Sequence, residues 1–167
     1  MNLNDIKTGD SFVCIGKPET NLFGWMTRRI ALSDFVHAGT FFWEGRHLMC
    51  AEIRIEGEHS KTTGYVVEPW ETRCKSLKKQ YDGTYWVSHE NTNNVKEAHI
   101  LEVLSGFVGS EYGYRKAFPI ALNLSLKRDS VVCSTIPERV CELMGYETHD
   151  WHPADVVRNG WVESQIL

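Results

Sequence analysis

Two side chains that can cooperate in nucleophilic catalysis lie far apart in the sequence. Cys133 follows the apolar pair at 131–132, and His37 lies inside the apolar stretch 35–43. A thiol becomes a strong nucleophile when it loses its proton, and a neighbouring imidazole can accept that proton. Both residues also have ordinary structural interpretations, as a satisfied core histidine and a small buried thiol. The sequence permits a Cys–His pair without establishing it.

The other cysteines and histidines offer weaker chemistry. The five cysteines contain no CxxC pair, and an odd number would leave one outside any disulfide framework, so we expect reduced thiols. Cys14 and Cys141 are expected to be packed inside the fold. His149 and His152 could hold a metal in principle, but no third ligand stands at a recognisable spacing. We therefore predict no metal and no cofactor, and place both histidines in a surface loop before Pro153.

The hydrophobic pattern predicts the elements that must position these residues. Alternating or continuous apolar runs bounded by turn residues predict strands at 11–16, 35–43, 47–55, 65–67 and 85–87, the second and third forming a hairpin. An Asp82-Gly83 turn is expected before the last strand. Helical spacing predicts helices at 21–32, from about 94 to 108, and at 135–144, the last with a Thr135-x-x-Glu138 capping box. Strands in one run with helices at both ends favour an α+β domain.

Length and composition exclude several classes of protein. A chain of 167 residues with 42% hydrophobic and 24% charged residues suits one folded domain, which we place at 1–167. The net charge of −4 disfavours a general nucleic-acid binder. No apolar run is long enough to span a membrane, and the polar start lacks the apolar core of a secretory signal. The expected compartment is therefore the cytoplasm.

Several short motifs, taken together and in order, resemble one family. The sequence resembles the circularly permuted NlpC-like cysteine hydrolases, the YiiX branch of the papain-like fold, in which a histidine comes early and the nucleophile late. The resemblance implies a papain-like α+β domain with a central antiparallel sheet or small barrel packed against helices. The segments that carry it span nearly the whole chain and lie at 9–10, 33–39, 109–114, 131–134, 145 and 153–155.

The resemblance assigns roles to individual residues. Cys133 is implied as the nucleophile and His37 as the base that activates it. The third member of such a triad fixes the imidazole tautomer, and Glu52, between apolar neighbours on a predicted strand, is the best candidate. A buried acid there would need a partner, whereas on an alternating strand Glu52 would face solvent, and the sequence leaves both alternatives open. His47 and His59 are weaker substitutes for the same role.

The oxyanion of acyl transfer needs fixed hydrogen-bond donors. The backbone N–H of Cys133 could supply one, and the hydroxyl of Tyr112 or Tyr114 another, although either tyrosine alone has ordinary packing as its simpler interpretation. Pro137 limits the helix-dipole argument, because it would press on the carbonyl of Cys133 if that residue were already helical. With Thr135 as N-cap, Cys133 lies just ahead of the helix and His37 must contribute more of the activation.

The predicted function is a cysteine hydrolase that cleaves an amide bond through an acyl-enzyme. Relatives of the NlpC type imply a short peptidoglycan peptide as substrate, in a recycling enzyme, a phage-encoded enzyme or a delivered effector. Two alternatives remain open at this point. Permuted relatives resembling lecithin:retinol acyltransferase imply a lipid ester or acyl-amide substrate, and a binding module that kept the fold without the chemistry is the alternative from another class.

Overall fold

The computed structural model describes residues 2–17, 33–54, 64–111, 131–149 and 151–167. Its centre is a six-stranded antiparallel sheet in the order β4-β3-β2-β1-β5-β6. The strands are β1 (Ser11–Gly16), β2 (Phe35–Glu44), β3 (His47–Arg54), β4 (Gly64–Pro69), β5 (Tyr81–Ser88) and β6 (Trp161–Gln165). Strands that are consecutive in the sequence are neighbours from β1 to β4, and β2 and β3 are joined by a two-residue turn.

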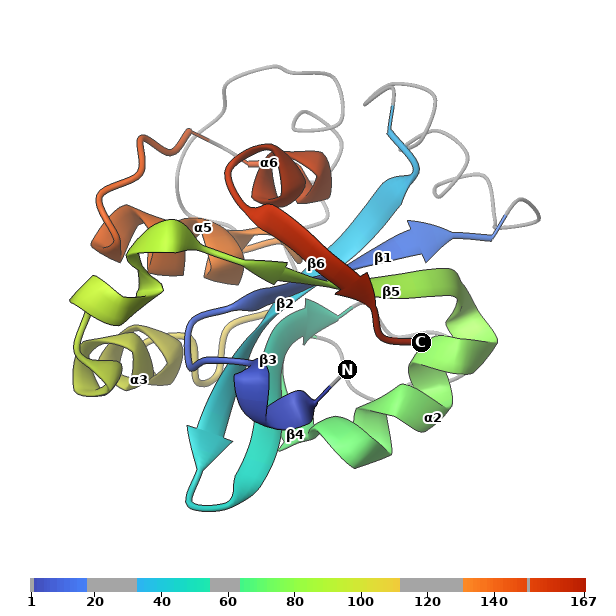
Figure 1. The fold of residues 1–167 in the computed structure, drawn as a ribbon, viewed down its shortest axis with the longest axis horizontal. Helices are drawn as coiled ribbons and strands as arrows, with labels where there is room; N and C mark the ends of the chain where they lie inside the picture. The colour runs from blue at the N-terminus through green and yellow to red at the C-terminus, as the bar shows by residue number, and fades with distance from the viewer. Residues whose placement is uncertain (1, 18–32, 55–63, 112–130, 150) are drawn as a thin grey trace.

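Helices cover both faces of this sheet (Figure 1). On one face α2 (Trp70–Gln80) packs on a core that includes Phe12, Phe41 and Leu77. On the other face α3 (Glu97–Ser105) and α5 (Thr135–Leu143) enclose Ile53, Ile100 and Ile136, among other residues. The short helix α6 (Pro153–Arg158) contacts β1 and β2. Two 3-10 turns, η1 (Leu3–Asp5) and η2 (Glu90–Asn94), complete the described elements.

The predicted α+β class is confirmed, and the predicted strands are present. The hairpin of β2 and β3 turns at Gly45, whose φ of +61° lies in the left-handed region that glycine adopts without strain. Gly39 on β2 is fixed by close packing, because a Cβ there would lie 2.5 Å from the ring of Phe12. This packing brings the predicted catalytic strand tightly against the aromatic core.

One expectation about elements is wrong, one is right only in part, and one cannot be judged. Asp82-Gly83 is not a turn, because both residues lie within β5, where Gly83 pairs with Ile15 of β1. The helix expected from about 94 to 108 is shorter, since η2 precedes α3 and Gly106 caps it. The sequence pattern also missed α2, α6 and β6. The helix expected at 21–32 lies outside the described residues.

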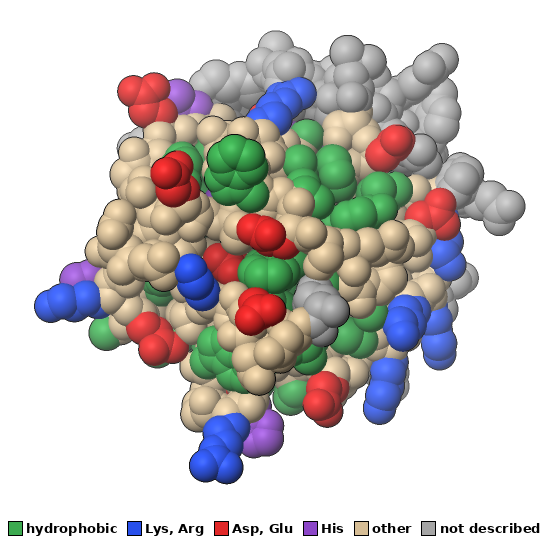
Figure 2. All heavy atoms as spheres, in the orientation of Figure 1, with side chains coloured by type: hydrophobic (Ala, Val, Ile, Leu, Met, Phe, Trp, Pro, Cys, Tyr) green, Lys and Arg blue, Asp and Glu red, His purple; other side chains and the backbone are tan. Residues whose placement is uncertain are grey.

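Charged side chains of both signs occupy the face shown in Figure 2, with basic ones gathered toward the edge formed by α2. That helix carries Lys75, Lys78 and Lys79, the last two in its final turn, where positive charge complements the helix dipole. None of the helices in the described ranges has the length and apolar character that a membrane span requires.

Candidate active site

His37 lies in the middle of the sheet, on β2, with 6% of its surface exposed. It pairs with Cys14 of β1, and its ring stacks on Tyr81 with 5.7 Å between ring centroids and 12° between ring planes. The aromatic ring of Phe12 lies on another side, 6.1 Å away between centroids. Packing from two neighbouring strands therefore fixes the plane of the imidazole.

Glu52 reaches the same imidazole from β3 and has no exposed surface. Its Oε2 lies 2.5 Å from Nε2 of His37. The alternative in which Glu52 faces solvent is therefore wrong, and the predicted acid–imidazole pair is present as a buried hydrogen bond. A carboxylate removed from water in this way requires further partners.

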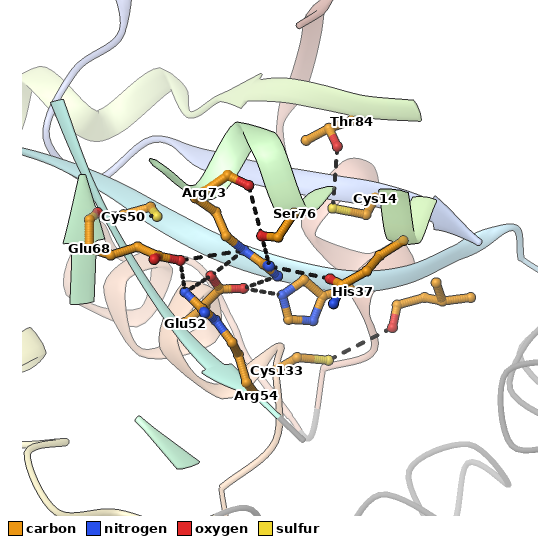
Figure 3. Close-up of polar contacts among 12 residues, drawn as sticks. Cys14, His37, Cys50, Glu52, Arg54, Glu68, Arg73, Ser76, Thr84 and Cys133 are labelled. Carbon is orange, nitrogen blue, oxygen red and sulfur yellow. Dashed lines mark hydrogen bonds and ion pairs between the residues drawn. The ribbon is translucent and has the colours of Figure 1, made fainter. Parts of the chain in front are cut away.

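Two arginines supply those partners (Figure 3). Arg73, from α2, places Nε 2.6 Å from Oε1 of Glu52 and donates from Nη2 to Oε2 at 2.9 Å. Arg54, two residues after Glu52 on β3, places Nη2 2.8 Å from Oε1. Arg54 also pairs with Glu68 of β4, so the four charges of this cluster balance. Both oxygens of Glu52 are thus engaged by cationic or imidazole donors.

These contacts determine which form of each group is stable. Burial opposes ionisation of Glu52, but the hydrogen bond from His37 and the charges of Arg73 and Arg54 outweigh it and lower the pKa to about 2. Burial also lowers the pKa of His37, against the opposing effect of Glu52. The imidazole is therefore neutral near pH 7. Because an ionised carboxylate only accepts hydrogen bonds, Nε2 carries the ring proton and Nδ1 keeps a free lone pair.

Cys133 lies against the backbone on either side of His37. Its Sγ is 4.0 Å from the carbonyl oxygen of Val36, and the backbone N–H of Ala38 interacts with the same sulfur. The ladder between β2 and β3 ends at the pair Thr40 and Ala51, so this stretch of β2 is left without its β3 neighbour. Figure 3 draws the thiol and the imidazole in the same part of the site, and the described contacts of the sulfur are with the backbone of Val36 and Ala38.

The thiol of Cys133 is the protonated species at rest. Burial raises its pKa to about 11, although the N–H groups of Ala38 and Ser134 favour the thiolate. α5 begins only at Thr135, two residues later. As Pro137 indicated, Cys133 therefore lies ahead of the helix and gains less from the dipole. A nucleophilic role for this thiol would therefore require a base to remove its proton.

The start of α5 differs from the expected capping box. Ser134, not Thr135, is the N-cap residue, and it makes no side-chain capping hydrogen bond. Thr135 Oγ1 instead accepts from the backbone N–H of Val132 at 2.9 Å, and Ser134 Oγ donates to the carbonyl of Trp151. These side chains tie the segment before and after Cys133 to the fold, because their hydroxyls satisfy neighbouring backbone groups rather than the helix end.

The remaining candidates are placed elsewhere or not described. His47 is exposed at the start of β3, so it cannot substitute for Glu52. Tyr112, Tyr114 and His59 lie outside the described residues, and their proposed roles stay predictions.

The histidine pair near Pro153 needs a correction. His149 is exposed, but His152 is buried and caps α6, where its Nδ1 accepts from the N–H of Ala154 at 3.2 Å. Asp155 completes that capping box by accepting from the N–H of His152. Within the described ranges, no three His, Cys, Asp or Glu side chains gather as a metal site would require.

Sequence reasoning missed both arginines of the site. Arg54 had a usable signal, because residues two apart on a strand point to the same face. Arg73 lies between Trp70 and Leu77 on the buried side of α2, where a helical pattern normally has an apolar residue. Because Arg73 interrupts the apolar face of α2, the hydrophobic pattern predicted neither this helix nor its buried arginine.

Comparison with known proteins identifies the fold class. Neither a protein-family model nor a curated protein matches the sequence. The chain has a YiiX-like, papain-type α+β fold. It is similar to the crystal structure of the metalloprotein YiiX (DUF1105) from Escherichia coli O157:H7, with a TM-score of 0.60 and 14% identity over 84% of this chain and 68% of that one. At this identity the likeness concerns the fold, and the NlpC-like kinship and the permutation stay predictions.

Proposed function

We propose that this protein is a cysteine hydrolase that cleaves an amide bond through an acyl-enzyme on Cys133. The observation that carries the proposal is that Glu52, His37 and Cys133 lie together on the sheet. An ionised, buried Glu52 accepts from Nε2 of His37, and the thiol of Cys133 lies beside the same histidine. A nucleophile, a base and a group that orients the base define nucleophilic catalysis of this type.

The reaction begins with general-base activation. Nδ1 of His37 takes the thiol proton as Sγ of Cys133 bonds to the carbonyl carbon of the substrate. The tetrahedral intermediate then expels the amine, which receives that proton from Nδ1, and a thioester remains on Cys133. Water attacks the thioester carbonyl while Nδ1 again accepts a proton, and the carboxylic acid leaves with the thiol restored. Glu52 keeps its charge throughout and stabilises the imidazolium.

A neutral resting pair fits this sequence of steps. Burial raises the pKa of Cys133 and lowers the pKa of His37, so a preformed thiolate–imidazolium pair is disfavoured before substrate binds. Proton transfer is then coupled to attack on the carbonyl. The N–H groups beside the sulfur, from Ala38, Ser134 and Cys133 itself, are the described backbone donors nearest the reacting atoms, and the Cys133 N–H is the one we assign to the oxyanion.

A metal does not fit the described donors of this site. The structurally similar YiiX is a metalloprotein, but here both oxygens of Glu52 are engaged by His37 and the two arginines, and two adjacent cations would repel a third. Burial also keeps the Cys133 thiol protonated, whereas a metal binds the thiolate. The proposed steps therefore use the side chains of the triad, the backbone N–H of Cys133 and water.

The substrate class rests on resemblance rather than on the geometry of the site. Relatives of the NlpC type cleave short peptides of peptidoglycan, so a short muropeptide is the proposed substrate. The lipid or acyl-amide alternative uses the same thiol and the same acyl-enzyme, and differs in the acyl group alone. The two are separated by direct assay.

The decisive experiment incubates the purified protein with muropeptides and, separately, with acyl-lipid and acyl-amide substrates, and identifies products by mass spectrometry. Cys133→Ala removes the nucleophile with little change in volume. Cys141→Ala is the matched control, because Cys141 is a buried thiol on α5 away from the described triad. We expect amide cleavage of a muropeptide by the wild type and by Cys141→Ala, and none by Cys133→Ala.

Two outcomes would change the conclusion. Turnover of acyl substrates alone, lost in Cys133→Ala, would assign the lipid branch of the fold. Absence of turnover on every substrate, with no adduct on Cys133, would favour a binding module that kept the fold without the chemistry.

A further inference from the structure

We propose that Arg73 and Arg54 are positioning residues with two effects on His37: they hold Glu52 as a carboxylate, so that Nε2 carries the ring proton and Nδ1 is free for the thiol, and their own positive charges oppose protonation of the ring. The inference rests on the proposed function and adds to it the part of the protein that sets the state of its base. Neither arginine was among the residues that the sequence or the family resemblance singled out.

The geometry of Arg73 is that of a clamp. Its Nη2 donates to Oε2 of Glu52 at 2.9 Å, and its Nε lies 2.6 Å from Oε1 as an ion pair without hydrogen-bond geometry, so one guanidinium contacts both oxygens of the carboxylate. The third nitrogen is also used, since Nη1 donates to Ser76 Oγ at 2.7 Å and to Gln80 Oε1 at 3.2 Å. With 2% of its surface exposed, Arg73 is held from both sides.

The two oxygens of the Glu52 carboxylate have different partners. Oε1 lies within ion-pair distance of Arg73 Nε and Arg54 Nη2, whereas Oε2 accepts hydrogen bonds from Arg73 Nη2 and His37 Nε2. Oε2 is thereby fixed in position before it accepts from the imidazole. A carboxyl without the arginines would be free to rotate or to take up a proton, and a protonated Glu52 could donate to Nε2 and place the ring proton on Nδ1.

Both arginines act on His37 in the same direction. Each cation lowers the pKa of the imidazole, in addition to the larger effect of burial, and each lowers the pKa of Glu52. Removal of one positive charge should therefore raise the pH at which His37 becomes protonated. A neighbouring unit charge at this range typically moves a titration midpoint by about one pH unit or more.

The other groups that face His37 do not titrate in the same range. Tyr81 stacks on the ring from β5, and burial raises its pKa well above the usual value. Cys14 on β1 and Cys133 before α5 are also buried thiols with raised pKa values. Glu68 on β4 reaches the cluster through Arg54 and does not contact the imidazole. The charges that set the state of His37 are thus those of Glu52 and the two arginines.

The test measures His37 directly. Protein labelled with ¹⁵N-histidine gives the protonation state and tautomer of each ring by NMR, and a His37→Gln variant assigns the signal. We expect the wild type to carry its proton on Nε2 and to become imidazolium below pH 6.5. In Arg73→Gln the midpoint should rise by about one pH unit, and the acid limb of hydrolysis should rise with it. Arg73→Lys keeps the charge and should keep the wild-type midpoint.

Lys75→Gln is the matched control, because it removes the same charge from an exposed position on α2 and should leave His37 unchanged. If Arg73→Gln does not fold, Arg54→Gln serves as the test, because the titration midpoint of His37 is expected to rise in that variant as well. Unchanged midpoint and tautomer in folded Arg73→Gln and Arg54→Gln would overturn the inference, even if the wild type hydrolyses its substrate. A shifted midpoint in a protein that hydrolyses nothing would uphold the action of the arginines on His37 and refute the proposed function instead.

Discussion

The imidazole of His37 and the phenol ring of Tyr81 lie nearly parallel, 12° apart, with 5.7 Å between their centroids. Tyr81 is the first residue of β5 and directly follows α2, the helix that carries Arg73. The segment from Arg73 to Tyr81 therefore supports His37 in two ways, by a flat ring against its face and by a cation that pairs with the carboxylate of Glu52. This arrangement makes the junction of α2 and β5 part of the site.

The stack predicts unequal effects of two substitutions at Tyr81. Tyr81→Phe keeps the ring and should leave hydrolysis within about threefold of the wild type, whereas Tyr81→Leu removes the flat support and should lower kcat by about tenfold or more with little change in KM. Steady-state kinetics on the substrate identified by mass spectrometry checks both. Equal losses in the two variants would mean that the hydroxyl, not the stack, matters.

Neutralising Glu52 should damage activity and stability together. Glu52→Gln keeps the shape but takes from the buried Arg73 its main carboxylate partner, while Arg54 keeps Glu68, so we expect a loss of about 3 to 5 kcal/mol in the free energy of unfolding. The tautomer of His37 is no longer fixed, which should lower kcat by about 10³-fold. Urea denaturation and kinetics measure the two effects.

Glu68→Gln is the control for that experiment, because Glu68 contacts Arg54 but not His37 and its side chain is 22% exposed. We expect it to cost less than about 1 kcal/mol and less than tenfold in rate. Wild-type activity in Glu52→Gln would remove Glu52 from the triad.

The raised pKa of Cys133 predicts how its alkylation depends on pH. Because the thiolate is the reactive form, the rate with iodoacetamide should rise about tenfold per pH unit from pH 6 to beyond pH 9. Peptide mapping should find label on the partly exposed Cys133 and Cys74 before the buried Cys14, Cys50 and Cys141. A rate that is already level near pH 7 would show a preformed thiolate and contradict the neutral resting pair.

His152 should make the protein less stable in acid. Burial lowers its pKa to about 4 in the folded state, against an ordinary value of 6.5. The unfolded chain therefore binds the proton more readily, so this contribution to stability is complete above pH 6.5 and is lost as the pH falls toward 4. Between pH 7 and pH 5 the loss from this residue should be about 2 kcal/mol.

His152→Asn tests this, because asparagine can still cap α6 but does not titrate. Urea midpoints of the variant should fall less between pH 7 and pH 5 than those of the wild type. His149→Asn, at an exposed position, should keep the wild-type dependence. An identical dependence in all three proteins would contradict the prediction.

Five of the six strands were predictable from local pattern, whereas Cys133, His37 and Glu52 were singled out by the family resemblance. Two apolar runs separated by Glu44-Gly45 predict a hairpin, and β2 and β3 form that hairpin in the structure. α2 was not predictable in the same way, because Arg73 interrupts its apolar stripe and its charge is paired with Glu52, 21 residues earlier. The Asp82-Gly83 turn failed because pairing with β1 overrides a local turn preference.

The sequence by itself determined which reactive groups exist and which stretches carry them: a thiol before a helix, an imidazole on one strand and a carboxyl on the next. Only the tertiary structure decided that Glu52 is buried rather than solvated, that two arginines surround it, and that Cys133 lies beside His37 across nearly a hundred residues of chain. The reason is physical, because burial and charge pairing depend on contacts between distant segments. Those contacts set the protonation states of His37, Glu52 and Cys133, and these states cannot be predicted from the residues next to them in the sequence.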